Sequence, residues 1–471
     1  MKFNKSSKNK FFLISLIFVL VYLNFAVIFK QYSDVWWDSA AYIGVGKYIF
    51  SYGEEGVFEP MRAPLLPLIL GIFWKLGFNV IYAGKIFIFL TAVFSLFFLY
   101  SISKELFDEN VAAVSCVILF FNVLFLIFVF RIYTEMLSIC LILASVFFML
   151  KFSSKGKYHS LFLSALFSVL AFLAKYPNVL IFGVLNIFLI YKTFKTKKIK
   201  PLLFFNIFFF VLVSPFFISN YLLFKDPLYL MKISQNYYKE NLGKLYSLKI
   251  FPSSPKFIFR TSFIYFYSIL LFFNILTPFM LFGIYKTFKR GERNFIKKLL
   301  LLFIALTFFC FFEIFYLKEE RYLLPIYPFL ALFSAYGLLK LKRRTAFLII
   351  FIYIILSIFS LALFFRGYDE KAYQSFFINP PINFSCGRAA TSDPRSVINY
   401  KVDFPYEVFD EYWTETNIIK KNPDCIFYFS CYKNREEHIK KLNKLNYSLE
   451  YPRDTGSCLY AILKKAPMKP L

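Results

Sequence analysis

Residues 160–191, SLFLSALFSVLAFLAKYPNVLIFGVLNIFLIY, decide how the rest of the chain threads a membrane. Nearly all of them are apolar or small, and Lys175-Tyr176-Pro177 interrupts the run near its middle. A single helix of this length would rise about 48 Å, whereas the hydrocarbon core of a bilayer is roughly 30 Å thick. We therefore predict two short spans, 160–174 and 177–191, rather than one kinked helix.

The distribution of basic residues supports the same choice. With two spans, the Lys- and Arg-rich segments 192–200, 286–298 and 340–344 fall on the cytoplasmic side. With one span, 224–261 and 318–321 lie there instead, and they hold fewer basic residues, although 224–261 is itself basic. The positive-inside rule favours two spans. The formal net charge of +27 is thus mostly a topology signal, and no nucleic acid partner is needed to explain it.

The composition is that of an integral membrane protein. Hydrophobic residues make up 59% of the chain and the mean hydropathy is +0.59, well above the values of soluble globular domains. The remaining predicted spans are 11–29, 80–101, 111–130, 135–151, 202–223, 262–285, 299–316, 322–339 and 345–365. Segment 11–29 follows several lysines and is interpreted as a retained span, with a cleaved signal peptide as the alternative.

Residues 1–365 are therefore predicted to form an all-α polytopic membrane bundle of about 11 transmembrane helices. Segment 65–77 is too short to cross and is predicted to be an interfacial helix in the first outer loop. The amino terminus is predicted to be cytoplasmic.

Hydropathy falls sharply after residue 365, which indicates a small extracytoplasmic α/β domain over 366–471. Strands are predicted at 425–432 and 458–465, and helices are predicted to begin at Ser392 and Asn434. The domain contains four cysteines, Cys386, Cys425, Cys431 and Cys458. Cys425 and Cys431 lie roughly 20 Å apart along one strand, too far to bond each other, so two disulfide connectivities remain beside four reduced thiols.

Charged residues gather at the predicted outer ends of the spans. These are Asp34, Asp38, Glu59 and Arg62 in the first loop, Arg131 and Glu135 between the third and fourth spans, Lys175, and Arg321 before the tenth. Each alone has a structural explanation, such as a snorkelling lysine or a solvated loop acid. Together they indicate a functional site, because a protein that only packs in the membrane has no reason to collect acids and guanidinium groups at several loop roots.

Two of these residues stand at specific positions. Asp38 follows Trp36-Trp37 and is placed to cap a helix over 39–51, whose Tyr42, Val45, Tyr48 and Ile49 share one face. Arg62 stands just before the short helix 65–77, and arginine is suited to holding a phosphate with its fork of donors.

At these residues the chain resembles the C-type glycosyltransferases of the protein O-mannosyltransferase and lipid A aminoarabinose-transferase group. The resemblance is carried by Asp38-Ser39-Ala40-Ala41-Tyr42, Arg62-Ala63-Pro64, Arg131-Ile132-Tyr133-Thr134-Glu135, Leu173-Ala174-Lys175-Tyr176-Pro177 and Arg321-Tyr322-Leu323-Leu324-Pro325. Ser39 stands where the family usually has a second carboxylate. Asp34 and Glu59 are the candidates to supply one.

The resemblance implies transfer of a sugar from a polyprenyl phosphate to an acceptor protein, lipid or glycan on the outer side. Asp38 is then the candidate general base, and Arg62, Lys175 and Arg321 are the candidates that hold the donor phosphate. Glu135 is a candidate to position the acceptor or to share a divalent cation with Asp38. The metal requirement is open, and the two histidines, His159 and His438, give no support for a zinc site.

Two other functions remain as alternatives. A transporter or lipid flippase predicts paired ionisable residues near the bilayer midplane and repeated broken helices. An oligosaccharide ligase of related architecture would move a whole glycan instead of one sugar.

Overall fold

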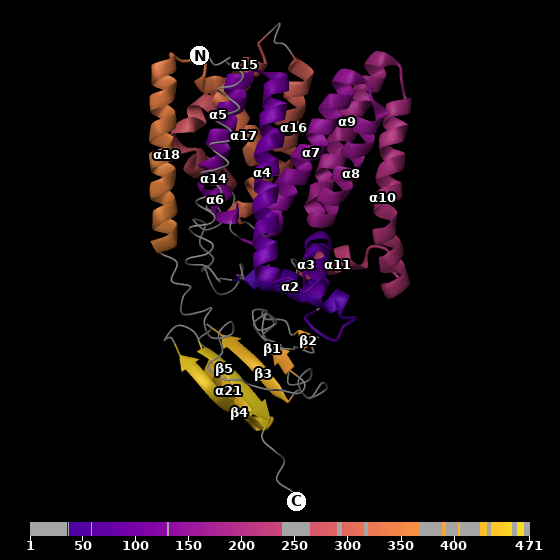
Figure 1. The fold of residues 1–471 in the computed structure, drawn as a ribbon, viewed down its shortest axis with the longest axis vertical. Coiled ribbons are helices and arrows are strands. Elements are labelled where there is room, and N and C mark those ends of the chain that lie inside the picture. The colour runs from indigo at the N-terminus through magenta and orange to yellow at the C-terminus, as the bar shows by residue number, and fades with distance from the viewer. Residues whose placement is uncertain are drawn as a thin grey trace, which may run out of the picture. The chain divides into compact units, whose positions relative to one another are not determined.

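A computed structural model describes most of the chain (Figure 1). The described residues are 35, 37–57, 59–129, 131–237, 264–289, 294–314, 319–366, 389–391, 404–405, 424–430, 435–454 and 459–465. They form two compact units. The first, called here the helical unit, contains the described residues from 85 to 366, and the second unit contains those from 35 to 84 and from 389 to 465.

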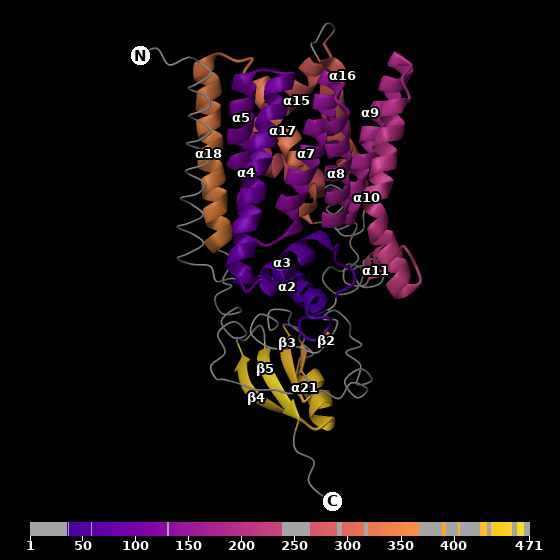
Figure 2. The same ribbon diagram turned by 45° about the vertical axis from the view of Figure 1, so that its right-hand side comes forward.

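The helical unit is a bundle of apolar helices, most of which run along one common direction (Figures 1 and 2). Its elements are α4 (Val80–Leu106), α5 (Glu109–Phe120), α6 (Val123–Val129), α7 (Thr134–Lys155), α8 (Tyr158–Ala174), η1 (Tyr176–Asn178), α9 (Val179–Thr196), α10 (Lys200–Phe224), α11 (Tyr229–Tyr237), α14 (Ile264–Phe273), η3 (Asn274–Leu276), α15 (Thr277–Thr287), α16 (Phe295–Ile314), η4 (Glu320–Ile326), α17 (Tyr327–Leu338) and α18 (Arg343–Arg366).

Among the described residues, seven helices are long and apolar enough to cross a membrane, or eight if the bent pair α5–α6 is one span. Of the other predicted spans, 160–174 is the shorter apolar helix α8. Segment 322–339 is divided between the 3₁₀ helix η4 and the short helix α17. Segment 11–29 lies outside the described residues.

The predicted break in 160–191 is confirmed. Helix α8 ends at Ala174, Lys175 is extended with φ −160° and ψ 118°, and α9 follows the short turn η1. Near the end of α9, Lys192 Nζ donates to the carbonyl of Ser153 at 3.2 Å. Ser153 stands at the end of α7, just before α8 begins, so α9 returns to the level at which α8 started. The two helices are therefore antiparallel.

Helices α15 and α17 approach each other through two glycines. A Cβ built on Gly283 would overlap the carbonyl oxygen of Phe333, and one built on Gly337 would overlap that of Phe279. Small residues at such crossings let helix backbones approach closely within a membrane.

We expect Gly283→Ala to destabilise the protein by about 1–3 kcal/mol, because the added methyl group has to push one backbone away from another. Gly183→Ala is the matched control, since a Cβ at Gly183 on α9 meets nothing within 4 Å. Thermal unfolding of the purified protein in detergent should show a lower midpoint for the first variant and an unchanged or slightly higher one for the control. Equal midpoints for both variants would refute the close-packing argument.

The second unit contains two helices from the segment after the first predicted span. These are α2 (Trp37–Phe50) and α3 (Leu65–Lys75). They cross tightly at Gly46, where a Cβ would lie 2.6 Å from the carbonyl oxygen of Pro67. The predicted helices 39–51 and 65–77 are thus confirmed, but α2 begins at Trp37. Asp38 therefore lies in the first helical turn instead of capping it from outside, a position where the helix dipole also favours a carboxylate.

The described residues of the tail contain a five-stranded sheet with strand order β2-β1-β3-β5-β4. The strands are β1 (Ala389–Thr391), β2 (Phe404–Pro405), β3 (Cys425–Ser430), β4 (Tyr447–Asp454) and β5 (Leu459–Lys465), with α21 (Arg435–Lys444) between β3 and β4. Strands β1, β2 and β3 are parallel, whereas β5 is antiparallel to β3 and β4. The predicted α/β layer is confirmed, and the helix expected at Ser392 lies outside the described residues.

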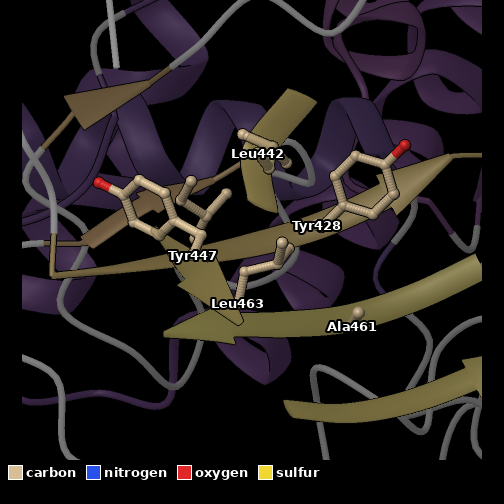
Figure 3. Packing of buried hydrophobic residues seen from close by; sticks show 6 residues of the cluster. Tyr428, Leu442, Tyr447, Ala461 and Leu463 are labelled. Atoms are coloured by element: carbon tan, nitrogen blue, oxygen red, sulfur yellow. The ribbon is translucent and has the colours of Figure 1, made fainter. Parts of the chain in front are cut away.

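Alternate residues of the strands build the core beneath α21 (Figure 3). Tyr428 on β3, Ala461 and Leu463 on β5, and Tyr447 on β4 pack against Leu442 of α21. This period of two places every second side chain of a strand on the helix-covered face.

Cys425, at the start of β3, is disulfide-bonded. The other three cysteines of the tail, Cys386, Cys431 and Cys458, lie outside the described residues. In the β3–β5 ladder Ser430 lies opposite Leu459. If that register continued by one residue on each strand, position 431 would lie opposite position 458.

We therefore expect the disulfides Cys386–Cys425 and Cys431–Cys458, since residues directly opposite on antiparallel strands are within bridging distance. Peptide mapping of the non-reduced protein should recover these two linked pairs. Free thiols should be found at Cys116, Cys140 and Cys310, which are not bridged in the structure. A Cys425–Cys458 peptide would show that the register changes beyond the described strands.

Candidate functional site

The predicted site residues fall into two clusters, one in each unit. The first cluster, in the second unit, is built on Arg62, which stands in a bend just before α3. Its Nη2 lies 2.9 Å from Asp38 Oδ1, and its Nε donates to Glu59 Oε2 at 2.8 Å. Its guanidinium group also lies over the ring of Tyr42, 5.0 Å from the centroid.

This arrangement follows from the local fold. Asp38 is held on the first turn of α2, and the tight α2–α3 crossing fixes the chain that leads into α3. The backbone N–H of Arg62 donates to the carbonyl of Glu59 at 3.2 Å, and this turn places the Glu59 side chain beside the guanidinium group. All three side chains are partly accessible, with 14% of Arg62 and 17% of each carboxylate exposed.

The second cluster, in the helical unit, is built on Glu135 in the first turn of α7. The Glu135 side chain is only 3% exposed. Its Oε1 accepts a hydrogen bond from Lys175 Nζ at 3.1 Å and lies 3.8 Å from Arg321 Nε. Its Oε2 is buried and has no hydrogen-bond partner among the described residues. One buried carboxylate thus faces two cations.

Contacts between α7 and α8 bring Lys175 to Glu135. Ser145 bridges to the carbonyl of Ser164 at 2.9 Å and to the hydroxyl of Ser168 at 2.7 Å. Nearer the site, Asn178 Nδ2 donates to Ser138 Oγ at 2.9 Å. Ser138 lies one turn after Glu135, so this bond fixes the Lys175 turn at the level of the carboxylate.

Arg321 reaches the same carboxylate from η4, which packs against α7 and α16. Pro325 lies within η4 and Pro328 at the start of α17. Because proline cannot donate a backbone hydrogen bond, this stretch does not form a regular α-helix. Arg321 Nε also lies 2.5 Å from Glu319 Oε2.

Aromatic rings flank both cations. Lys175 Nζ lies 4.4 Å from the centroid of the Tyr322 ring, and the Arg321 guanidinium group lies 5.2 Å from that of Tyr133. Such contacts stabilise a cation through the negative face of the ring.

The structure brings together most, though not all, of the predicted residues. Asp38, Glu59 and Arg62 form one cluster, and Glu135, Lys175 and Arg321 form the other. Arg131 is 9% exposed and stacks on Phe128 at 5.3 Å. Asp34 lies outside the described residues.

Glu319 and Lys85 were missed as site candidates. Glu319 precedes Arg321 by two residues, much as Glu59 precedes Arg62 by three, and this shared spacing is the signal that could have found it. Lys85 lies in α4 and is only 2% exposed, and an ionisable residue buried in a span is a functional candidate by default.

The clusters do not fit a metal centre. Among the described residues, no three His, Cys, Asp or Glu side chains are grouped as a metal site. Asp38 and Glu135 each face a cationic side chain instead. Neither carboxylate is therefore assigned to a divalent cation.

A family model and several solved structures resemble the chain. The model of the dolichyl-phosphate-mannose-protein mannosyltransferases matches residues 61–218, about a third of the chain. No curated protein matches the chain. The crystal structure of ArnT from Cupriavidus metallidurans bound to undecaprenyl phosphate matches with a TM-score of 0.72 and 12% identity, covering 98% of each chain.

The archaeal oligosaccharyltransferase AglB from Archaeoglobus fulgidus is also similar. Its complex with an inhibitory peptide and a dolichol-phosphate matches with a TM-score of 0.60 and 13% identity, covering 99% of this chain and 75% of that one. The chain thus shares its fold with proteins whose structures hold undecaprenyl phosphate or dolichol-phosphate. The resemblance to C-type glycosyltransferases is confirmed, as is the multi-pass bundle with a small strand region.

Proposed function

We propose that this protein is a membrane glycosyltransferase that moves a sugar from a polyprenyl phosphate to an acceptor on the extracytoplasmic side. The observation that carries the proposal is the second cluster. Two cations, Lys175 and Arg321, are held on one buried carboxylate in a fold whose solved examples bind undecaprenyl phosphate and dolichol-phosphate. A lipid phosphate needs cations beside its headgroup, and the pair Lys175 and Arg321 supports that role.

In this proposal Lys175 and Arg321 bind the donor phosphate, and Glu135 orients them. A sugar phosphate leaves with its electron pair on a phosphate oxygen, so negative charge grows there as the bond to the anomeric carbon breaks. Preorganised cations stabilise that charge without a general acid. The two flanking tyrosines keep the cations in place before the donor arrives.

Asp38 takes the acceptor's proton. The acceptor hydroxyl oxygen forms the new bond to the anomeric carbon, its proton passes to the Asp38 carboxylate, and the polyprenyl phosphate departs. Arg62 was predicted to bind the donor phosphate, and nothing in the structure tests that role. Its carboxylate contacts take up two different nitrogens, Nε and Nη2, whereas Glu135 and Glu319 both face the single atom Nε of Arg321. We therefore assign Arg62 to positioning Asp38 and leave the phosphate to Lys175 and Arg321.

The orientation of the chain is part of the proposal. The basic segments after α9, after α15 and after α17 argue that these ends are cytoplasmic. The opposite end of the bundle, where Glu135 and Lys175 lie, is then extracytoplasmic. The disulfide at Cys425 supports an extracytoplasmic domain over 366–471, because disulfides persist in oxidising compartments.

The proposal is tested by sugar transfer in membranes that contain the full-length protein. The assay offers labelled polyprenyl-phosphate monosaccharides, and separately lipid-linked oligosaccharides, to the endogenous acceptors. We expect labelled acceptor with a monosaccharide donor that is absent from membranes without the protein. Transfer from oligosaccharide donors alone would make the protein a ligase. Movement of the lipid between leaflets without any transfer would replace the enzyme by a flippase.

A further inference from the structure

Arg321 is shared by two carboxylates that differ in accessibility. Glu135 is 3% exposed and lies 3.8 Å from Arg321 Nε, whereas Glu319 is 35% exposed and lies 2.5 Å from the same atom. The closer carboxylate is thus the one that water and dissolved ions can reach.

This difference gives the two acids separate roles. Removing Glu135 from its cations would leave buried charge uncompensated, which is costly. Glu319, which is 35% exposed, can leave Arg321 and be hydrated at a smaller cost than Glu135, because ion pairs that water reaches contribute less than buried ones. Glu135 is therefore a fixed anchor, and Glu319 is an exchangeable ligand of the guanidinium group.

We propose that Glu319 competes with the lipid phosphate for Arg321 and thereby promotes release of the product. The inference rests on the proposed function, since it takes Arg321 as part of the donor phosphate site. Carboxylates and phosphates use the same guanidinium donors, so one displaces the other. The donor displaces Glu319 when it binds, and Glu319 returns when the product leaves.

The chemistry of the reaction explains why such a competitor is useful. The phosphate of the donor is a diester with one negative charge. When the bond to the sugar breaks, the electron pair stays on the phosphate oxygen, and the monoester that remains carries up to two negative charges. A site made only of cations would hold this product more tightly than the donor. A carboxylate tethered beside Arg321 offsets that excess affinity.

The backbone holds Glu319 close to Arg321. Its N–H donates to the hydroxyl of the buried Tyr265 at 3.2 Å, and its extended conformation, φ −128° and ψ 136°, leads directly into η4. Arg321 follows two residues later. The carboxylate therefore remains next to the guanidinium group whether or not the phosphate is bound.

The test measures binding of undecaprenyl phosphate and dolichyl phosphate, both without sugar, to the full-length protein in nanodiscs. Glu319→Gln is expected to bind at least one of them roughly three- to tenfold more tightly than wild type, because the competing charge is gone. Glu320→Gln is the matched control. It removes the same charge from the next residue, which is exposed and forms no ion pair among the described residues. It should bind like wild type.

Arg321→Met separates the competing role of Glu319 from the phosphate site itself. This substitution should weaken binding of the lipid phosphate. The double variant with Glu319→Gln should then bind the lipid no more tightly than Arg321→Met alone. A gain in affinity cannot come from misfolding. Wild-type binding that Arg321→Met weakens, without tightening by Glu319→Gln, would overturn the role of Glu319 alone. Lack of wild-type binding to either lipid, or binding that ignores Arg321, would overturn the phosphate site and this inference with it.

Discussion

Replacing Asp38 with Asn should reduce sugar transfer by roughly 10²- to 10⁴-fold, the range expected when a general base is lost. The amide keeps the shape of the carboxylate and can still accept a hydrogen bond from Arg62, but it cannot take a proton from the acceptor. Binding of the polyprenyl phosphate should be retained, because the phosphate site is assigned to Lys175 and Arg321 in the other cluster.

Glu59→Gln is the matched control for this prediction. Glu59 and Asp38 contact the same guanidinium group at 2.8 and 2.9 Å, and both are 17% exposed. If Asp38 only holds Arg62 in place, the two variants should lose transfer equally. We expect Glu59→Gln to lose tenfold or less, since it still leaves Asp38 paired with Arg62. Initial rates at saturating donor, with the amount of folded protein matched, decide between these outcomes.

The fold was predictable where a feature depends on local sequence. The break at Lys175-Tyr176-Pro177 combines a charge with a proline, and its prediction is confirmed. The 68° bend between α5 and α6 has no such signal, because residues 111–130 are almost uniformly apolar. The bend is stabilised by Asn122, which donates to the carbonyl of Phe272 at 3.2 Å and accepts from Phe125 N at 3.3 Å. Phe272 is 150 residues away in the sequence, so a local pattern does not reveal this contact.

The same reasoning applies to the site. Counting the predicted helices shows which charged residues lie at one end of the spans. This count identified Glu135, Lys175 and Arg321. Which of them touch depends on how α7 packs against α8 and η4, and that is set by the serine contacts between α7 and α8 and by the irregular backbone of η4. The occupation of Arg62 by two carboxylates likewise depends on the α2–α3 crossing.

The second large effect is expected for Glu135→Gln, which removes the countercharge of two cations. Breaking a buried ion pair by changing one partner typically costs 3–5 kcal/mol, and with Lys175 16% exposed we expect about 3 kcal/mol. The midpoint of thermal unfolding should fall, and transfer should fall at least tenfold, because Lys175 and Arg321 lose the group that orients them toward the phosphate. Glu105→Gln is the control at the other end of the bundle. Glu105 pairs with Lys297 at 3.3 Å and is 27% exposed, so its loss should leave transfer unchanged.

The double variant Glu135→Gln/Lys175→Met separates stability from function. Removing the lysine together with its carboxylate eliminates one uncompensated charge, so part of the lost stability should return. Transfer should stay low, because the phosphate has now lost a cation. Stability that falls by the sum of the two single effects would show that the residues do not interact. Recovery of transfer in the double variant would show that Lys175 does not serve the donor phosphate, and the role of Glu135 would then have to be argued through Arg321 alone.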